Sequence, residues 1–136
     1  MTSEYRKPLP TPSPLTQPFW DGLDEGVVRV QRCADCREYQ FYPRPHCVAC
    51  LSERLDWVLL SGRGKVYSFT VVRRAMNPAF AADVPYAYAI VELDEGPRLM
   101  TNVVGCAVED VEVDMPVRAV YDRVTSEITL LKFEPR

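Results

Sequence analysis

Histidine is scarce in this sequence, and features that membrane proteins depend on are missing. His46 is the single histidine among 136 residues, which rules out much of the enzymology that relies on imidazole groups. No run approaches the roughly 20 consecutive apolar residues of a membrane span. The first seven residues, Met-Thr-Ser-Glu-Tyr-Arg-Lys, do not form a signal peptide. We therefore expect a cytoplasmic protein with no membrane partner.

Common catalytic motifs are missing as well. The sequence contains no G-x-S-x-G elbow, no P-loop, no G-x-G-x-x-G and no H-E-x-x-H. Residues 61–64, Ser-Gly-Arg-Gly, include two glycines but are not followed by Lys-Ser or Lys-Thr, so they make a weak phosphate cradle. No base, nucleophile and electrophile can be assembled into a site. The expectation is a binding module that is not an enzyme by itself.

Charge is distributed unevenly along the chain. The net charge is −3, yet residues 29–74 hold nine basic and four acidic side chains, whereas residues 75–136 hold five basic and eleven acidic ones. Arginine outnumbers lysine 13 to 3, and arginine suits bidentate contact with phosphate or carboxylate groups better than lysine does. The middle third of the chain is therefore either an anion-binding region or a set of solvated surface charges.

The N-terminal region changes from a proline-rich arm to a short helix. Five prolines fall within residues 1–18, and proline at this density favours extended chain over helix or sheet. We interpret residues 1–17 as an arm, either free or draped over a partner. Pro18 and Gly26 then mark the start and end of a helix. Phe19, Trp20 and Leu23 would form its apolar side.

The rest of the chain is rich in strand signals. Residues 27–32 and 40–42 read as strands around the cysteines, and residues 51–61 as a connector. Five further strands are expected, over residues 65–74, 86–93, 98–104, 117–124 and 127–133. This number of short strands suggests a small closed barrel or a sandwich. The strand over residues 86–93 is apolar on both faces, so we expect it to be covered on both.

Four of the five cysteines form two C-x-x-C pairs. The spacing Cys33-Ala-Asp-Cys36, then Cys47-Val-Ala-Cys50, allows four thiolates to surround one tetrahedral zinc ion. Four protein ligands leave no open position for water, so the zinc would be structural. Three alternatives to zinc were weighed. Two disulfides would require an oxidising compartment, and a thioredoxin-type redox pair usually needs only one C-x-x-C. A mononuclear iron site would use the same four thiolates, so iron stays open as the metal.

Two residues with reactive side chains lie outside this set. His46 is adjacent to Cys47, but four cysteines already satisfy tetrahedral zinc, so we expect it on the surface of the knuckle. Cys106 is expected to be a small buried apolar residue. As a nucleophile it would need a base, and the single histidine is next to a proposed ligand.

Four stretches of the sequence together resemble a known family. They are residues 18–23 running into Gln31-Arg32-Cys33, the two knuckles with Phe41-Tyr42-Pro43-Arg44 between them, Trp57 with residues 61–68, and residues 78–96. Together they resemble rubredoxin-like zinc-ribbon plus OB-fold proteins associated with acyl-CoA enzymes, the domain of unknown function thirty-five. The resemblance covers roughly residues 18–133. One departure is Arg37, where the family often has glycine, a residue that tolerates a left-handed backbone.

The resemblance implies a mainly β fold with an arm over residues 1–17, a helical hook and rubredoxin-like zinc ribbon over residues 18–60, and a five-stranded OB-fold barrel over residues 61–136. It implies one structural zinc per chain, held by the four clustered cysteines. It also implies a non-catalytic subunit that binds a thiolase-like enzyme (thiolase, acyltransferase or aldolase) in a hetero-oligomer and helps to line the passage for CoA or acyl-CoA.

Candidate contacts follow from these expectations. The residues considered for the CoA phosphates flank the first barrel strand: Arg63, Lys65, Arg73 and Arg74. The residues considered for the partner interface are apolar: Phe19, Trp20, Met76, Phe80 and Tyr86. The alternative function is single-stranded nucleic-acid binding, with OB-fold aromatics stacking on bases. The net charge of −3 argues against it, because nucleic-acid-binding domains are usually basic.

Overall fold

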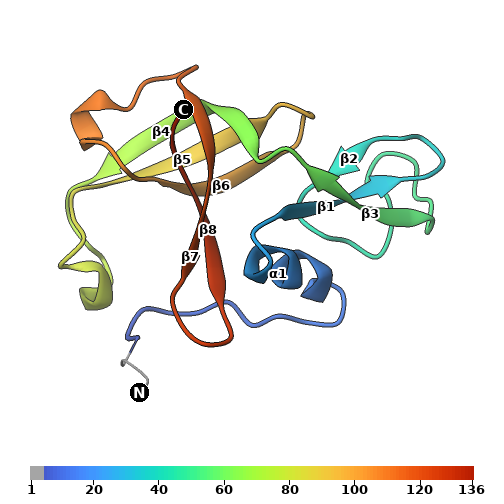
Figure 1. Cartoon of the computed structure of the whole chain (residues 1–136), viewed down its shortest axis with the longest axis horizontal. Helices are drawn as coiled ribbons and strands as arrows, with labels where there is room; N and C mark the ends of the chain where they lie inside the picture. Colours follow the sequence, from blue (N-terminus) through green and yellow to red (C-terminus); the bar gives the residue numbers. More distant parts are fainter. Residues whose placement is uncertain (1–4) are drawn as a thin grey trace.

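A small three-stranded sheet and a five-stranded barrel lie next to each other in this structure, a computed structural model that describes residues 5–136 (Figure 1). The helix α1 lies below the junction between them in the view of Figure 1. In chain order, the elements are α1 (Gln17–Asp24), β1 (Val28–Cys33), β2 (Tyr39–Gln40), β3 (Leu55–Leu60), β4 (Arg63–Val72), η1 (Pro78–Phe80), β5 (Tyr86–Leu93), β6 (Arg98–Val103), η2 (Val108–Asp110), β7 (Pro116–Arg123) and β8 (Thr129–Pro135).

The expected helix forms, and it joins the two sheets. Pro18 lies in its first turn, where the missing N–H costs nothing, and Gly26 follows its end with a φ of 75°. The side chains of Phe19 and Leu23 are buried. The helix packs against β1 of the small sheet and against β7 and β8 of the barrel. Eight residues are too few for a stable isolated helix, so this packing accounts for its stability.

The small sheet has the antiparallel order β2-β1-β3. The expectation of a connector over residues 51–61 is wrong for its middle part, because Leu55–Leu60 forms β3 and pairs with β1 along its whole length. Burial along β3 does not alternate from residue to residue, so the period-two signal of a half-buried strand is missing. The pairing gives the small sheet a third strand and leads directly into the barrel.

The barrel closes in the order β4-β5-β6-β8-β7, with β7 returning to β4. The β6–β8 pair is parallel and the other pairs are antiparallel. This is a five-stranded OB-type barrel, so the expected fold class is confirmed. Each barrel strand begins and ends within two residues of its expected position. The buried core includes Val66, Val91, Val117 and Phe133.

Strand β5 has one face in the barrel core and one at the surface of the described chain, so the expected cover of its second face by something else stays a prediction. Burial alternates along it, with Ala87, Ala89, Val91 and Leu93 facing the core. On the other face Tyr88 remains 45% exposed. The sequence Tyr-Ala-Tyr-Ala hid this alternation because alanine and tyrosine both count as apolar. Within residues 5–136, β5 is therefore fully covered on its core face only.

The described part of the N-terminal arm follows the protein's own surface. It crosses the β7–β8 hairpin near the turn of that hairpin on its way to α1 (Figure 1), and Lys7 forms an ion pair with Asp83 in the loop before β5. The Lys7 Nζ also lies 5.6 Å from the centroid of the Phe80 ring. The first four residues of the expected arm fall outside the described part of the chain. Among residues 5–136, no helix has the length and apolar character that crossing a membrane would require.

Candidate functional site

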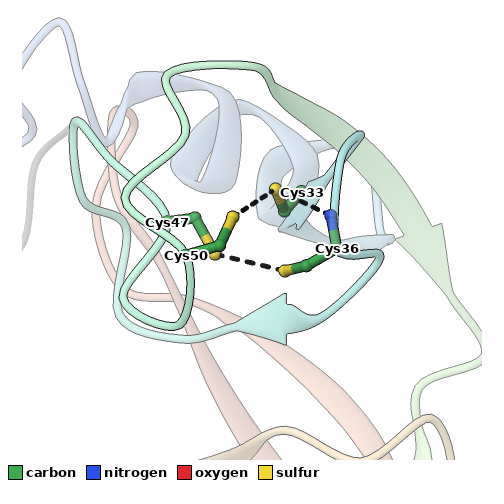
Figure 2. A group of neighbouring side chains, drawn as sticks. All are labelled: Cys33, Cys36, Cys47 and Cys50. Carbon is green, nitrogen blue, oxygen red and sulfur yellow. Dashed lines mark hydrogen bonds between the residues drawn. The ribbon is translucent and has the colours of Figure 1, made fainter.

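Four cysteine side chains converge at the end of the small sheet. Cys33 is the last residue of β1, Cys36 lies in the turn that follows, and Cys47 and Cys50 lie in the loop between β2 and β3. Figure 2 shows the four sulfur atoms pointing toward one another from the two loops. All four Sγ atoms lie within 4.8 Å of one another. The structure therefore brings the whole cysteine set together.

The two loops have the same backbone geometry. In the first, the carbonyl of Cys33 accepts from the N–H of Arg37 at 2.9 Å, and in the second, the carbonyl of Cys47 accepts from the N–H of Leu51 at 2.9 Å. Arg37 and Leu51 both have left-handed backbones, with φ values of 65° and 67°. Arg37 thus adopts the left-handed conformation although it stands at the position where the family often has glycine. A non-glycine residue pays a modest conformational cost there.

The distances between the sulfurs fit a tetrahedral metal. The Sγ atoms of Cys33 and Cys50 are 3.6 Å apart, and those of Cys36 and Cys47 are 3.5 Å apart. A zinc ion with Zn–S bonds of about 2.3 Å has S–S edges of about 3.8 Å in an ideal tetrahedron. All four residues are free cysteines. The donor set and its spacing therefore fit zinc, with iron as the metal that uses the same ligands.

Backbone N–H groups in the knuckles favour thiolates. The N–H of Cys36 donates to the sulfur of Cys33 and lowers the pKa of that thiol to about 6. The N–H of Cys50, followed by that of Ala49, lowers the pKa of Cys47. Hydrogen bonds to the charged form stabilise it, and the thiolate is the form that binds a metal. The two buried cysteines are thus the ones that favour the thiolate, whereas burial, followed by hydrogen bonds to the neighbouring thiols, raises the pKa of Cys36 and of Cys50.

Two glutamines that were not among the candidate site residues lie beside this cluster. Gln31 on β1 and Gln40 on β2 are buried, and their side chains hydrogen-bond to each other and to the loop that carries Cys47. Both lie in strands next to a cysteine knuckle. A polar residue in such a short strand normally indicates an exposed face, so only their proximity to the cysteines was available as a signal.

His46 and Cys106 take no part in the cluster. His46 is exposed, and its Nε2 lies 3.8 Å from the carboxylate of Glu53. Cys106 is half-buried against the barrel core, where burial and then the charge of Asp110 raise the pKa of its thiol. A raised pKa keeps it in the unreactive thiol form at neutral pH.

The structure does not gather the four cationic candidates into one site. Arg63 and Lys65 lie at the first end of β4, whereas Arg73 and Arg74 follow its last residue. The Lys65 ammonium lies 3.9 Å from Glu92 and 3.7 Å from Asp114. Arg73 lies 4.0 Å from the carboxylate of Glu109. Arg63 and Arg74 are exposed.

The apolar candidates differ in how much surface they present. Phe19 is 4% exposed and packs inside the chain, with its ring 5.2 Å from that of Phe41. Met76 is 97% exposed in the loop after β4. Phe80 and Tyr86 are half-buried, with ring centroids 6.3 Å apart. Trp20 is half-buried at the edge of a groove.

That groove lies where the helix, the ribbon and the barrel meet. We call it the aromatic groove; it has a volume of about 330 Å³ and its more exposed lining residues are Trp20, Tyr42, Tyr88 and Met100. A second hollow of about 270 Å³, lined by Phe80 and Tyr86 among others, adjoins it through shared lining residues. The two hollows meet at Asn102, Leu130 and Lys132, and the second also contains the Lys7–Asp83 ion pair, so their aromatic and aliphatic residues are interrupted by polar ones.

Comparison with protein families matches both parts of the chain. The family described as the ChsH2 rubredoxin-like zinc ribbon domain matches residues 20–56. The family described as the ChsH2 C-terminal OB-fold domain matches residues 57–122. The two matches follow one another without a gap and meet inside β3. They cover more than half of the chain.

Curated relatives show similarity over most of this chain. A probable enoyl-CoA hydratase alpha subunit of Thermomonospora curvata is 42% identical over 118 residues, which cover 86% of this chain and 36% of the relative. The chain therefore spans about a third of that protein. A DUF35 domain-containing scaffold protein of Methanocaldococcus jannaschii is 38% identical over 71% of this chain and 68% of its own length. The benzoylsuccinyl-CoA thiolase subunit BbsA of Geobacter metallireducens is 35% identical over 57% of this chain and 51% of its own.

A solved structure agrees with nearly the whole chain. A chain of the Ltp2-ChsH2(DUF35) aldolase superposes with a TM-score of 0.83 at 36% identity. The match covers 93% of this chain and 98% of the other. The relative placement of helix, ribbon and barrel is thus common to both proteins.

Proposed function

The chain belongs to the ChsH2 family, in which a rubredoxin-like zinc ribbon precedes an OB-fold domain, and we propose that it is a non-catalytic accessory subunit of a thiolase-like acyl-CoA enzyme. The observation that carries the proposal is the end-to-end agreement with the ChsH2(DUF35) chain of an aldolase. Relatives named as a scaffold protein and as a thiolase subunit support it. The relative named as a hydratase subunit is more than twice as long, so we do not propose hydratase activity for this chain.

The proposed partner surface is the apolar face formed by the aromatic groove and the loop before β5. Met76 projects from that loop almost fully exposed, and Phe80 and Tyr86 connect the loop to the groove. Protein interfaces are enriched in aromatic residues and methionine at their centres. Trp20 at the other end of the face would extend the same contact.

We further propose that the partner's CoA passes near the end of β4. Arg73 and Arg74 lie three and two residues before Met76, so the proposed partner surface and these cations are neighbours in the chain. Arg63 and Lys65 are weaker candidates because they lie at the other end of β4. Lys65 is in addition surrounded by two carboxylates, which would have to release it before it could bind a phosphate.

The metal in this proposal is one structural zinc per chain, held by Cys33, Cys36, Cys47 and Cys50. The part of the chain before residue 61 is too small to build a core that folds unaided, and in domains this small a metal normally supplies the missing stability. We propose residues 18–60 as the helical hook and ribbon and residues 61–136 as the barrel. In this division the ribbon's role is to shape one wall of the aromatic groove.

Nucleic-acid binding has less support as a second function. Single-stranded nucleic acid requires cations beside the stacking aromatics. The two lysines next to this face, Lys7 and Lys132, each form an ion pair with an aspartate. We therefore propose a protein, and not a nucleic acid, as the partner for this face.

Isolation of a tagged chain from its native host tests the proposal. We expect a thiolase-like protein in near-stoichiometric amount, identified by mass spectrometry. The variant Phe80→Asp should weaken the complex at least tenfold while leaving the metal content unchanged. Leu59→Asp is the matched control, because Leu59 is 63% exposed on β3, at the opposite end of the molecule from η1 (Figure 1). Recovery of nucleic acid alone, or equal weakening by both variants, would contradict the proposed role or its surface.

A further inference from the structure

Two amide side chains are buried inside the zinc ribbon, where polar groups are costly. Gln31 is 3% exposed and Gln40 is 6% exposed. The two residues are Cα partners across β1 and β2, and the Nε2 of Gln40 donates to the Oε1 of Gln31 at 2.8 Å. A buried amide destabilises the fold unless it is hydrogen-bonded. Among the described residues, no buried side-chain nitrogen or oxygen lacks a hydrogen-bond partner.

Gln31 holds the chain where it approaches the second knuckle. Its Oε1 accepts from the backbone N–H of Arg44 at 2.9 Å, and its Nε2 donates to the carbonyl of Arg44 at 2.9 Å. These are the two bonds that a neighbouring strand would supply to Arg44. The side chain therefore replaces a strand where β2 has already ended.

Gln40 continues this pattern on both sides of Cys47. Its Nε2 donates to the carbonyl of His46 at 3.2 Å, and its Oε1 accepts from the N–H of Val48 at 2.9 Å. These two groups belong to the peptide units immediately before and after Cys47. One side chain thus contacts both peptide units that set the direction of the Cys47 side chain.

The remaining polar groups of these two peptide units are held by the knuckle itself. The N–H of Cys47 donates to the carbonyl of Ser52 at 2.8 Å, and its carbonyl accepts from the N–H of Leu51 at 2.9 Å. All four backbone groups around Cys47 are therefore fixed, two by the knuckle and two by Gln40. The Cys47 sulfur is held 3.5 Å from that of Cys36.

We propose that Gln40 is a positioning residue for the metal ligand Cys47, and that Gln31 orients the Gln40 amide. This inference rests on the proposed metal site. Groups that orient metal ligands typically contribute 10–100-fold to metal affinity. Loss of Gln40 should therefore weaken metal binding by a factor in this range while the barrel remains folded.

The test compares metal binding in four purified full-length variants. Gln40→Met keeps the length of the side chain but removes its hydrogen bonds, and Gln31→Met removes the contacts to Arg44. Gln17→Met is the matched control, because Gln17 is exposed and its side chain donates to Asp21 on α1, away from the cysteine cluster. Val91→Ala weakens the barrel core at β5, a strand that pairs with β4 and β6 and not with the strands of the ribbon. The probes are Co(II) titration, followed by its thiolate charge-transfer and ligand-field bands, and zinc transfer to the chelator 4-(2-pyridylazo)resorcinol.

We expect Gln40→Met to bind Co(II) 10–100-fold more weakly and to release zinc correspondingly faster, with Gln31→Met showing the same change to a smaller extent. Gln17→Met and Val91→Ala should behave as the wild type does in both metal assays, although Val91→Ala lowers the thermal midpoint. If wild-type protein binds no metal, the proposed metal site fails and the inference fails with it. If wild-type protein binds metal but Gln40→Met releases it no faster, or if Val91→Ala accelerates release equally, the metal site stands and the positioning role is refuted.

A conservative variant covers the case in which Gln40→Met does not fold. Gln40→Glu keeps an oxygen that accepts from Val48 but loses the NH₂ group that donates to His46 and Gln31. We expect an intermediate loss of Co(II) affinity, and a wild-type affinity would overturn the proposal.

Discussion

Gly64 is the residue whose substitution gives the sharpest test of the barrel. It pairs with Leu93 on β5 and with Val117 on β7, so it lies where β4 closes the barrel on both sides. A Cβ atom added there would lie 3.0 Å from Cγ1 of Val91 and 3.1 Å from the carbonyl carbon of Glu92, with the Glu92 oxygen closer still. Glycine is therefore required by the close approach of the β5 backbone.

The expected cost follows from these contacts. Carbon atoms normally approach to about 3.5–4.0 Å, so the added methyl group would intrude by roughly half an ångström on these two carbons and by more on the Glu92 carbonyl oxygen, which belongs to backbone paired in the barrel. Overpacking of this kind costs about 1–3 kcal/mol, and we expect Gly64→Ala to reach the upper limit because backbone cannot rotate away. With a urea m-value of about 1.5 kcal/mol/M, the midpoint should fall by about 2 M.

Equilibrium urea unfolding followed by circular dichroism measures this effect. The control is Gly26→Ala, which has a left-handed φ of 75° but no atom within 4 Å of the added Cβ. Its cost should be limited to about 1–2 kcal/mol of backbone strain. If Gly64→Ala is no more destabilising than Gly26→Ala, the close approach of β5 does not constrain this position and the reasoning is wrong.

Three further outcomes are expected. Metal chelation should unfold the ribbon segment over residues 33–50 while the barrel keeps its β signal in circular dichroism. If the β signal of the barrel is lost together with the ribbon, the two parts do not unfold separately. Thr129→Val removes the 2.7 Å hydrogen bond to Asp24 and should cost about 1 kcal/mol in urea unfolding, whereas Thr70→Val on the exposed face of β4 should cost nothing measurable. Burial raises the pKa of Tyr121, so the folded state holds that proton longer than the unfolded chain does and stability should fall as the pH rises above 10. In pH-dependent unfolding, Tyr121→Phe should show a shallower decline, and an identical decline would contradict the assignment.

The strand pattern of the barrel was accessible from the sequence because turn residues separate short runs rich in β-branched and aromatic residues. The turn at residues 94–97 between β5 and β6 is an example. Strand β3 was not accessible, because residues 55–60 carry an acidic residue and five apolar ones without regular alternation. Its place is set by pairing with β1, which is a long-range property.

The cysteine cluster could be predicted from the sequence, whereas the arrangement of the surface cations could not. The spacing of the two C-x-x-C pairs indicates a tetrathiolate site directly, because each pair needs only a local turn. The four cations around β4 are also close in sequence, yet a ten-residue strand separates Arg63 from Arg73. Sequence proximity therefore grouped side chains that an extended strand keeps apart. The partnership of Gln31 and Gln40 depends on strand register and could not be obtained from either residue alone.

The aromatic groove brings a wall formed by the ribbon next to the outer face of the barrel. Its walls come from the helix, the ribbon and the barrel, with Trp20 on α1, Tyr42 after β2, and Tyr88 and Met100 on β5 and β6. Tyr42 lies in the segment that leads to Arg44, which Gln31 holds by two hydrogen bonds. Any loosening of the ribbon would therefore move one wall of the groove while the barrel wall stayed in place. If the proposed partner binds at this groove, a structural metal in the ribbon would affect that binding through the position of Tyr42.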